Sequence, residues 1–174
     1  MSRKHWMIVL GTATVVLTVV GVLLERPMEH AGAPGILAFE FAATKARVSQ
    51  LLAEWGPAGR HAARVSLIVD YAYMVSYGGF FTLAGLATRD LSARQGWRRL
   101  AAAGQIVPFF AATAACFDAI ENVFLLIALA GNGGNTAPLL ATVCSSIKWM
   151  LITLAIIYAI CGAVGWFRRT PQPA

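Results

Sequence analysis

The sequence predicts an all-α polytopic membrane protein, a four-transmembrane-helix bundle with an amphipathic helix in the first outer loop. Hydrophobic residues make up 58% of the 174 residues and charged residues only 13%, with a mean hydropathy of +0.66. This composition is too apolar for a soluble domain of this size. The chain also contains four apolar runs long enough to span the bilayer core, which takes about 20 residues each. We therefore expect a single membrane domain over residues 1–174.

The expected transmembrane helices cover residues of about 6–24, 65–87, 105–130 and 138–166. The first run is too long for the apolar core of a signal peptide, and residues 24–27 offer no small-residue cleavage site, so we expect it to be retained. Pro108 lies near the start of the third run. Because proline removes a backbone donor and clashes with the preceding turn, we expect a kink there or a first turn outside the membrane.

The loop between the first and second runs is expected to contain the amphipathic helix. Apolar residues return at helical spacing from Phe41 through Trp55, and Gly56-Pro57 ends the pattern. Such a helix lies in the outer interface or caps the outer mouth of the bundle. The alternative is a surface helix that only closes the loop.

The distribution of lysine and arginine predicts that both termini are cytoplasmic. The basic residues of the three segments expected on this side are Arg3, Lys4, Arg89, Arg94, Arg98, Arg99, Arg168 and Arg169. The opposite side receives an uncharged turn at residues 131–135 and the long first loop, where acidic residues offset the basic ones. Trp6, Trp97 and Trp166 would then form an aromatic belt at the cytoplasmic boundary.

Four ionisable residues fall inside the expected spans: Asp70, Asp118, Glu121 and Lys148. Each costs about 2.5 to 3.5 kcal/mol at the centre of a membrane helix, so none is expected to face lipid. Because they share a depth, we predict that Lys148 lies within salt-bridge reach of Asp118 or Glu121, with Asp70 on the same side of the interior. One ammonium group cannot balance three carboxylates, so one or two carboxyl groups are expected to hold a proton.

Polar residues accompany these charges on the same helix faces, since positions three or four apart lie on one side of a helix. The candidate ligand-binding or proton-relay residues are Asp70, Tyr73 and Tyr77 on the second run, Asp118, Glu121 and Asn122 on the third, and Ser145 and Lys148 on the fourth. Buried groups of this kind are typical of proton relays, acid/base pairs and cation sites, but also of structural networks.

Three short motifs carry a resemblance to a known group of proteins. They are Phe39-Glu40-Phe41, Asp70-Tyr71-x-Tyr73-Met74-x-x-Tyr77-Gly78 and Asp118-x-x-Glu121-Asn122. With them the chain resembles a group of small, uncharacterised four-span bacterial membrane proteins, which implies the bacterial cytoplasmic (inner) membrane and no particular activity. The shared first motif adds Glu40 to the candidate residues. The chain is more loosely similar to the sterol-isomerase-like four-helix family, in which acidic residues and an asparagine handle apolar ligands, but it lacks a histidine in any run.

No metal and no cofactor are expected. The histidines lie outside the apolar runs and the cysteines form no CxxC pair; they are His5, His30, His61, Cys116, Cys144 and Cys161. Nucleic acid is not an expected partner, because the basic residues flank apolar runs. The expected partners are the lipid bilayer, a lipid-like small molecule, and a second copy of the chain or another membrane protein.

Three function classes follow from the acidic residues. The first is binding of a hydrophobic or amphipathic small molecule, with the Phe41–Trp55 helix as a lid. The second is a membrane enzyme in which Asp118 or Glu121 acts as general acid/base on an apolar substrate. The third is a structural or accessory subunit in which the charges form an internal lock. A ligand-sized pocket bordered by the carboxyl groups would favour the first two, and tight closure the third.

Overall fold

The structure is a computed structural model that describes residues 2–167. Four of its helices are long and apolar enough to cross a membrane: Arg3–Glu25, Lys45–Arg94, Val107–Leu129 and Thr136–Trp166. They coincide with or contain most of each expected span, and the described residues form no strand. The prediction of an all-helical chain with four such helices is therefore confirmed. Arg168 and Arg169, used above to predict orientation, lie outside the described residues.

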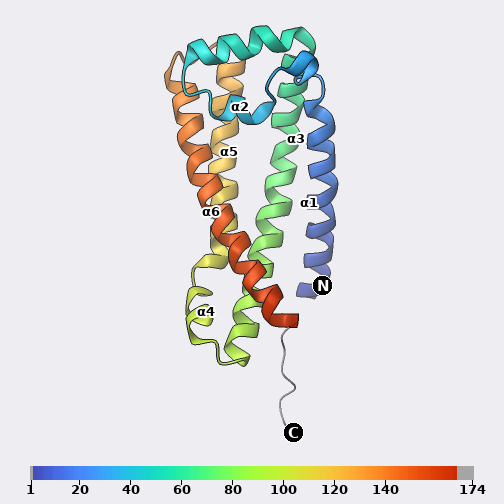
Figure 1. Ribbon diagram of the computed structural model, residues 1–174, viewed down its shortest axis with the longest axis vertical. Coiled ribbons are helices and arrows are strands. Elements are labelled where there is room, and N and C mark those ends of the chain that lie inside the picture. The colour runs from blue at the N-terminus through green and yellow to red at the C-terminus, as the bar shows by residue number, and fades with distance from the viewer. Residues whose placement is uncertain (1, 168–174) are drawn as a thin grey trace.

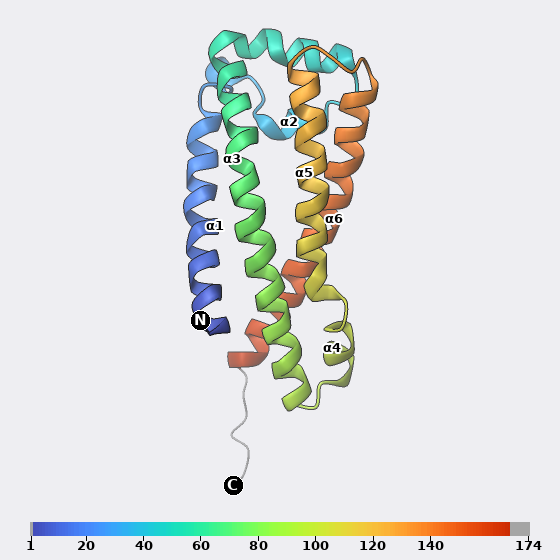
Figure 2. The ribbon, with the colours of Figure 1, turned by 180° about the vertical axis from the view of Figure 1, so that it is seen from behind.

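Three helices form the centre of the bundle, and the first lies beside it. The long helices α3 (Lys45–Arg94), α5 (Phe110–Leu129) and α6 (Thr136–Phe167) pack against one another. Helix α1 (Arg3–Glu25) packs mainly against α3, at the edge of the bundle in Figures 1 and 2. No residue of α1 is buried, and many of its large apolar side chains, such as Ile8, Val15 and Val22, are exposed.

One end of the bundle carries η1 (His30–Gly32), α2 (Ile36–Glu40) and the first part of α3, and is termed the α2 end (Figure 1). The amphipathic helix expected from Phe41 begins instead at Lys45, because Ala43 adopts a left-handed φ of 55° and Thr44 caps the new helix by accepting a hydrogen bond from Arg47 N at 3.3 Å. Phe41 follows α2 and is exposed. The expected end at Gly56 is confirmed, since its φ of 61° and ψ of −170° are not helical.

The first segment of α3 closes this end of the bundle. Its apolar face is buried in a core shared with the ends of α5 and α6, made of residues that include Val48, Leu51, Leu52, Trp55, Leu125, Leu129, Ala137 and Ala141. Trp55 also packs edge-to-face against Phe39 of α2, with ring centroids 5.4 Å apart. Of the alternatives for this segment, the cap over the end of the bundle is therefore the one observed.

The opposite end carries α4 (Arg98–Ala103) and the start of α1, and is termed the α4 end (Figure 1). Helix α4 is separated from α5 by a turn and by η2 (Val107–Phe109). Pro108 lies in the first positions of this 3-10 turn, where its missing N–H is tolerated. The expected third helix therefore begins later than residue 105, and the irregularity expected at Pro108 is a turn that precedes α5.

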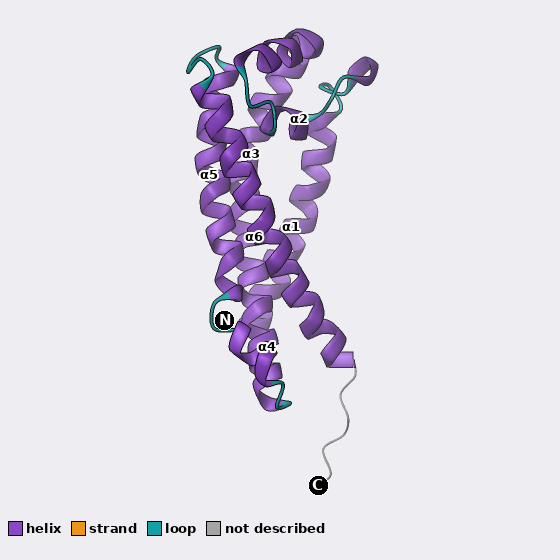
Figure 3. Cartoon of the chain, turned by 60° about the vertical axis from the view of Figure 1, so that its left-hand side comes forward, coloured by secondary structure: helices purple, strands orange, loops and turns teal. Residues whose placement is uncertain are grey.

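Loops and turns join the other helices (Figure 3). At the end of α5 the chain reverses at Gly131, whose φ is 80°. Gly131 N donates to Ala128 O at 2.9 Å, and Asn132 N donates to Ile127 O at 3.1 Å. These two bonds form a Schellman motif, which satisfies carbonyl groups at the helix end. The tight turn expected at residues 131–135 is therefore confirmed.

Candidate functional site

A buried lysine on α6 contacts carboxylates from two other helices. Lys148 Nζ lies 2.8 Å from Glu121 Oε2 and 2.9 Å from Asp118 Oδ1 on α5, and 3.3 Å from Glu40 Oε2 on α2. The side chains of Lys148, Asp118, Glu121 and Glu40 are 8%, 5%, 0% and 13% exposed. The predicted proximity of Lys148 to Asp118 or Glu121 is therefore confirmed for both. These four residues are termed the Lys148 cluster.

The positions of the cluster along the helices explain why it forms. Asp118 and Glu121 are three residues apart and so share the face of α5 that packs against α6. Glu121 precedes the end of α5 by about two turns, and Lys148 follows the start of α6 by about three turns. Because these antiparallel helices meet at the residue 131–135 turn, the two positions lie at similar heights, toward the α2 end.

Hydrogen bonds from α6 and from the residue that precedes it hold the end of α2 in place beside the cluster. Thr142 Oγ1 donates to Glu40 O at 2.9 Å and accepts from Ala43 N at 3.1 Å. Asn135 Oδ1 accepts from Lys45 N at 2.8 Å. The chain between α2 and α3 is thus anchored on both sides of its left-handed residue, and Glu40 is directed toward Lys148.

The Glu40 carboxylate is the most exposed acid of the cluster. Its Oε2 accepts hydrogen bonds from Ser145 Oγ at 3.2 Å, Trp149 Nε1 at 3.2 Å and Lys148 Nζ at 3.3 Å. The Trp149 side chain is 45% exposed, and the centroid of its ring lies 5.6 Å from Lys148 Nζ, within range of a cation–π interaction. The boundary between α2 and α6 is therefore the edge at which the cluster meets the surface.

Two residues at this edge were missed by the sequence analysis. Thr142 and Trp149 both contact Glu40, one through its backbone and one through its side chain. They lie three residues before and four residues after Ser145, and so share its helix face. The spacing of these polar groups along one side of α6 is the signal that could have found them.

Helix α3 contributes the tyrosines that were predicted as site residues. Tyr77 is buried, and its hydroxyl group donates to Asp118 Oδ2 at 2.8 Å. The Tyr73 ring is tilted against that of Tyr77, with centroids 5.1 Å apart. Thr18 Oγ1 of α1 lies 3.5 Å from the Tyr73 hydroxyl group. The two tyrosines thus extend from Asp118 toward α1.

Asp70 joins the site through Asn122 rather than through Lys148. Asn122 Nδ2 donates to Asp70 Oδ2 at 2.9 Å and to Leu67 O at 3.1 Å. Asn122 directly follows Glu121, so Asp70 lies on the α3 side of the same group of residues. Within residues 2–167, Asp70 has no ion-pair partner. The structure therefore brings all nine predicted site residues into one network or its immediate neighbourhood.

The charges of the network do not balance. Three carboxylates contact one ammonium group, and Asp70 adds a fourth acid without a cation. Glu121 Oε1 is buried and has no hydrogen-bond partner among the described residues, although Oε2 of the same carboxylate contacts Lys148. Uncompensated charge in a low-dielectric interior is costly. The network therefore has the capacity to accept a proton or a cationic group.

A hollow of about 410 Å³ lies at the α2 end but is not bordered by any of these four acids. The buried side chains of the cluster are in close contact with one another instead. In residues 2–167, no three histidine, cysteine, aspartate or glutamate side chains are grouped so as to hold a metal ion. The functional groups of the network are thus the carboxyl groups of four acids, one amine and two phenols.

Comparison with known proteins assigns no family. No protein-family model, no curated protein and no solved structure matches the chain. The resemblance carried by the Glu40, Asp70 and Asp118 motifs therefore stays a prediction, and the function must be argued from the residues themselves.

Proposed function

We propose that this is an integral membrane protein that binds an amphipathic small molecule with a cationic head group at the Lys148 cluster. The observation that carries the proposal is the excess of acid: three carboxylates contact one ammonium group, and Glu121 Oε1 is buried without a partner. A cationic group would supply the charge and the hydrogen-bond donor that this interior lacks.

The membrane setting is supported by length and exposure. The 23 residues of α1 rise by about 34 Å, enough to cross a hydrocarbon core of about 30 Å. Large apolar side chains are exposed along α1 and α6, including Val15, Val19, Leu154 and Ile157, and lipid is the solvent that would cover them. We infer four transmembrane spans on this basis.

The orientation follows from charge. Arg3, Lys4 and the basic residues from Arg89 to Arg99 lie toward the α4 end, so we place this end in the cytoplasm. The α2 end then faces outward. The resemblance to bacterial four-span proteins supports the cytoplasmic (inner) membrane as the location.

Access to the cluster is proposed beside α2. Glu40 is the acid with the greatest exposure, and exposed Leu37, Phe41 and Trp149 surround it with apolar surface. A ligand arriving from the membrane would place its cation near Glu40 and its tail along these side chains. The helix expected to act as a lid is thus replaced in this proposal by α2, because α2 carries the acid.

A structural lock is the second candidate. It is favoured by the close burial of Lys148, Asp118 and Glu121, which together hold α5 against α6. This tight closure, with the hollow at the α2 end bordered by none of the four acids, is the arrangement expected from the sequence to favour a lock. A pure lock requires only that the charges stabilise the helices. It does not require a preference for any cationic molecule, and this difference decides the test.

The test compares two probes of equal tail length, dodecylamine and dodecanol, on protein in phosphatidylcholine nanodiscs. We expect isothermal titration calorimetry, corrected with empty nanodiscs, to detect binding of the amine and not of the alcohol. Glu121→Gln should weaken amine binding by about tenfold or more, the effect of losing an ionic hydrogen bond. Asp90→Asn, which removes a carboxylate at the α4 end, is the matched control and should leave binding unchanged.

Two results would contradict the binding site. One is equal binding of the amine and the alcohol. The other is a Glu121→Gln variant with a lower melting temperature and unaltered amine affinity, which would leave the lock as the function of the cluster.

A further inference from the structure

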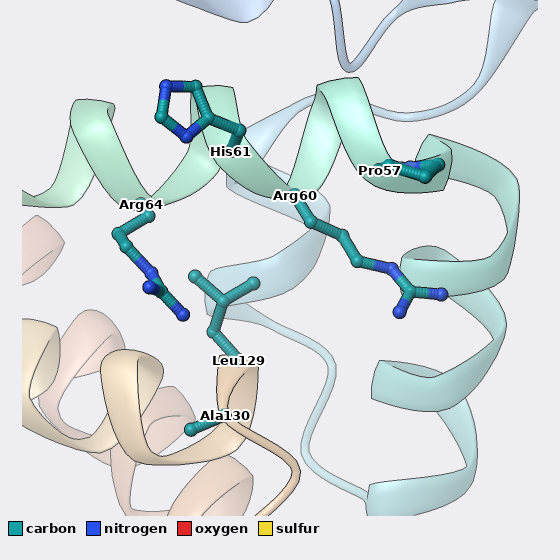
Figure 4. A pocket seen from close by; sticks show the side chains of 6 residues that line it. All are labelled: Pro57, Arg60, His61, Arg64, Leu129 and Ala130. Carbon is teal, nitrogen blue, oxygen red and sulfur yellow. The ribbon is translucent and has the colours of Figure 1, made fainter.

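The hollow at the α2 end is lined by a different chemistry from the Lys148 cluster. Its residues are Pro57, Arg60, His61, Arg64, Leu129 and Ala130, and its volume is about 410 Å³ (Figure 4). This volume falls within the range of about 300–1,000 Å³ that is usual for small-molecule sites. The lining contains two guanidinium groups and no acid.

The two arginines share one side of α3. Arg60 and Arg64 are four residues apart, so their side chains leave the same helix face. In Figure 4 their guanidinium groups lie on either side of Leu129, below the helix. Arg60 is oriented by its Nε, which donates to Leu52 O at 2.7 Å, near the point where Gly56 interrupts the helix.

The positive charge of the hollow is not neutralised by the protein. Within residues 2–167, the side chain of Arg64 has no hydrogen bond or ion pair, and the terminal nitrogens of Arg60 have none. Glu54, the acid that precedes Arg60 by six residues, accepts a hydrogen bond from Gln50 Nε2 instead, at 2.8 Å. The Schellman motif at Gly131 engages two carbonyl groups at the end of α5. Fewer free hydrogen-bond acceptors are therefore available to the arginines on the side of the hollow formed by Leu129 and Ala130.

The location of the hollow suits a lipid head group. Leu129 is the last residue of a helix apolar enough to span the membrane, and Arg64 lies above it. In a membrane, the end of a span coincides with the level of the phosphate groups. The hollow has apolar residues, Leu129 and Ala130, on one side and the arginines on the other. At that level of the membrane, this arrangement matches the boundary between the acyl chains and the head group of a lipid.

We propose that this hollow binds the phosphate group of an anionic phospholipid. The planar guanidinium fork of Arg64 would donate paired hydrogen bonds to phosphate oxygens, with Arg60 adding charge. The glycerol and first acyl carbons would lie on Leu129 and Ala130. The inference rests on the membrane insertion proposed above and is independent of the ligand of the Lys148 cluster.

The test measures which lipids stay bound. Protein reconstituted in equal parts of phosphatidylglycerol and phosphatidylcholine is released into mild detergent, and the retained lipids are identified by native mass spectrometry. We expect phosphatidylglycerol to be enriched about tenfold, and Arg64→Gln to abolish the enrichment. Arg64→Gln is chosen because Arg64 is exposed and its side chain makes no hydrogen bond or ion pair within residues 2–167. The control Arg47→Gln removes a charge from the same helix outside the hollow and should retain the enrichment.

A second arm separates the source of the phosphate. Inorganic phosphate, added at constant ionic strength against chloride, should displace phosphatidylglycerol from the wild-type protein. If phosphate binds with the same dependence on Arg64 while phosphatidylglycerol is not enriched, the lipid assignment is overturned. Equal losses in Arg64→Gln and Arg47→Gln would overturn the site, because they would indicate general attraction to anionic lipid.

The two proposals can fail separately. Carbonate extraction of membranes shows whether the chain is inserted, and a chain released by carbonate would overturn both. For an inserted chain, Glu121→Gln should leave phosphatidylglycerol retention unchanged while it weakens dodecylamine binding. Loss of lipid retention in Glu121→Gln at an unchanged melting temperature would overturn the independence of the two sites.

Discussion

The ion pairs in the two halves of the molecule have similar lengths and opposite surroundings. At the α4 end, Arg3 Nη1 lies 2.6 Å from Asp90 Oδ2, and these side chains are 45% and 34% exposed. In the Lys148 cluster, the 2.8 Å contact joins Lys148 to Glu121, whose side chains are 8% and 0% exposed. Water screens the first pair far more than the second. The shorter ion pair is therefore the one expected to contribute less.

The two regions also differ in the sign of their excess charge. Asp90 is paired with both Arg3 and Arg89, which leaves positive charge at the surface, where water solvates it. The Lys148 cluster has an excess of negative charge that is buried. Excess charge at the surface costs little free energy, because water solvates it. Excess charge in the interior must be neutralised by a proton or a ligand, or it lowers the stability of the fold. Burial, rather than the length of an ion pair, thus marks the region where function is expected.

Removing the lysine should produce the largest effect. Lys148→Met leaves three neighbouring carboxylates without their cation, and breaking a buried pair in this way costs about 3 to 5 kcal/mol in the free energy of unfolding. We expect a large fall in the melting temperature of the detergent-purified protein, measured by circular dichroism.

A compensating variant checks the cause of that loss. Lys148→Met combined with Asp118→Asn and Glu121→Gln removes charge of both signs, and should recover a substantial part of the melting temperature. If the single Lys148→Met variant melts at the same temperature as the wild-type protein, Lys148 does not stabilise the fold by neutralising the buried carboxylates.

Removing one hydroxyl group from the cluster should have an intermediate effect. Tyr77→Phe keeps the ring against Tyr73 but deletes the 2.8 Å hydrogen bond to Asp118. Hydrogen bonds to charged groups contribute about 1.5 to 3 kcal/mol, so the free energy of unfolding should fall by that order. Equilibrium unfolding in denaturant provides the measurement.

The matched control for this change is Tyr71→Phe. Tyr71 is exposed, and its hydroxyl group donates to Ala119 O at 3.3 Å. The same deletion there should cost less than about 1 kcal/mol. Equal losses in the free energy of unfolding for the two variants would contradict the view that burial determines how much these hydrogen bonds stabilise the protein.

Much of the site was predictable because helix periodicity places residues on faces. The spacing of Asp118, Glu121 and Asn122 predicts one polar face, and the cost of charge in lipid predicts that Lys148 must meet it. Both arguments concern residues within long helices, where the backbone geometry is regular. The network around Asp118 could therefore be assembled from the sequence.

The remaining features depend on which helices are neighbours and on irregular backbone. The spacing of Gly11, Thr14, Thr18 and Gly21 gives α1 a stripe of small and hydroxylated residues, but it does not show that α1 packs mainly on α3 at the edge of the bundle. The approach of Glu40 depends on the left-handed turn at Ala43 and on the Thr142 hydroxyl group, a contact between residues distant in sequence. No local pattern specifies such contacts, so the boundary of the amphipathic helix was predicted wrongly.

The smallest effect is expected at the α4 end, where Asp90→Asn removes the solvent-accessible ion pairs of Asp90 with Arg3 and Arg89. The free energy of unfolding should fall by only about 0.2 to 1 kcal/mol at low salt, because surface ion pairs gain little against water. Raising the salt concentration to about 1 M shortens the screening length to about 3 Å and should remove this difference. The loss caused by Lys148→Met should persist at the same salt concentration, since ions in solution do not screen a buried cluster to the same extent. Melting temperatures of both variants across a salt series provide the measurement, and a salt-dependent loss in Lys148→Met would mean that water and ions reach the cluster.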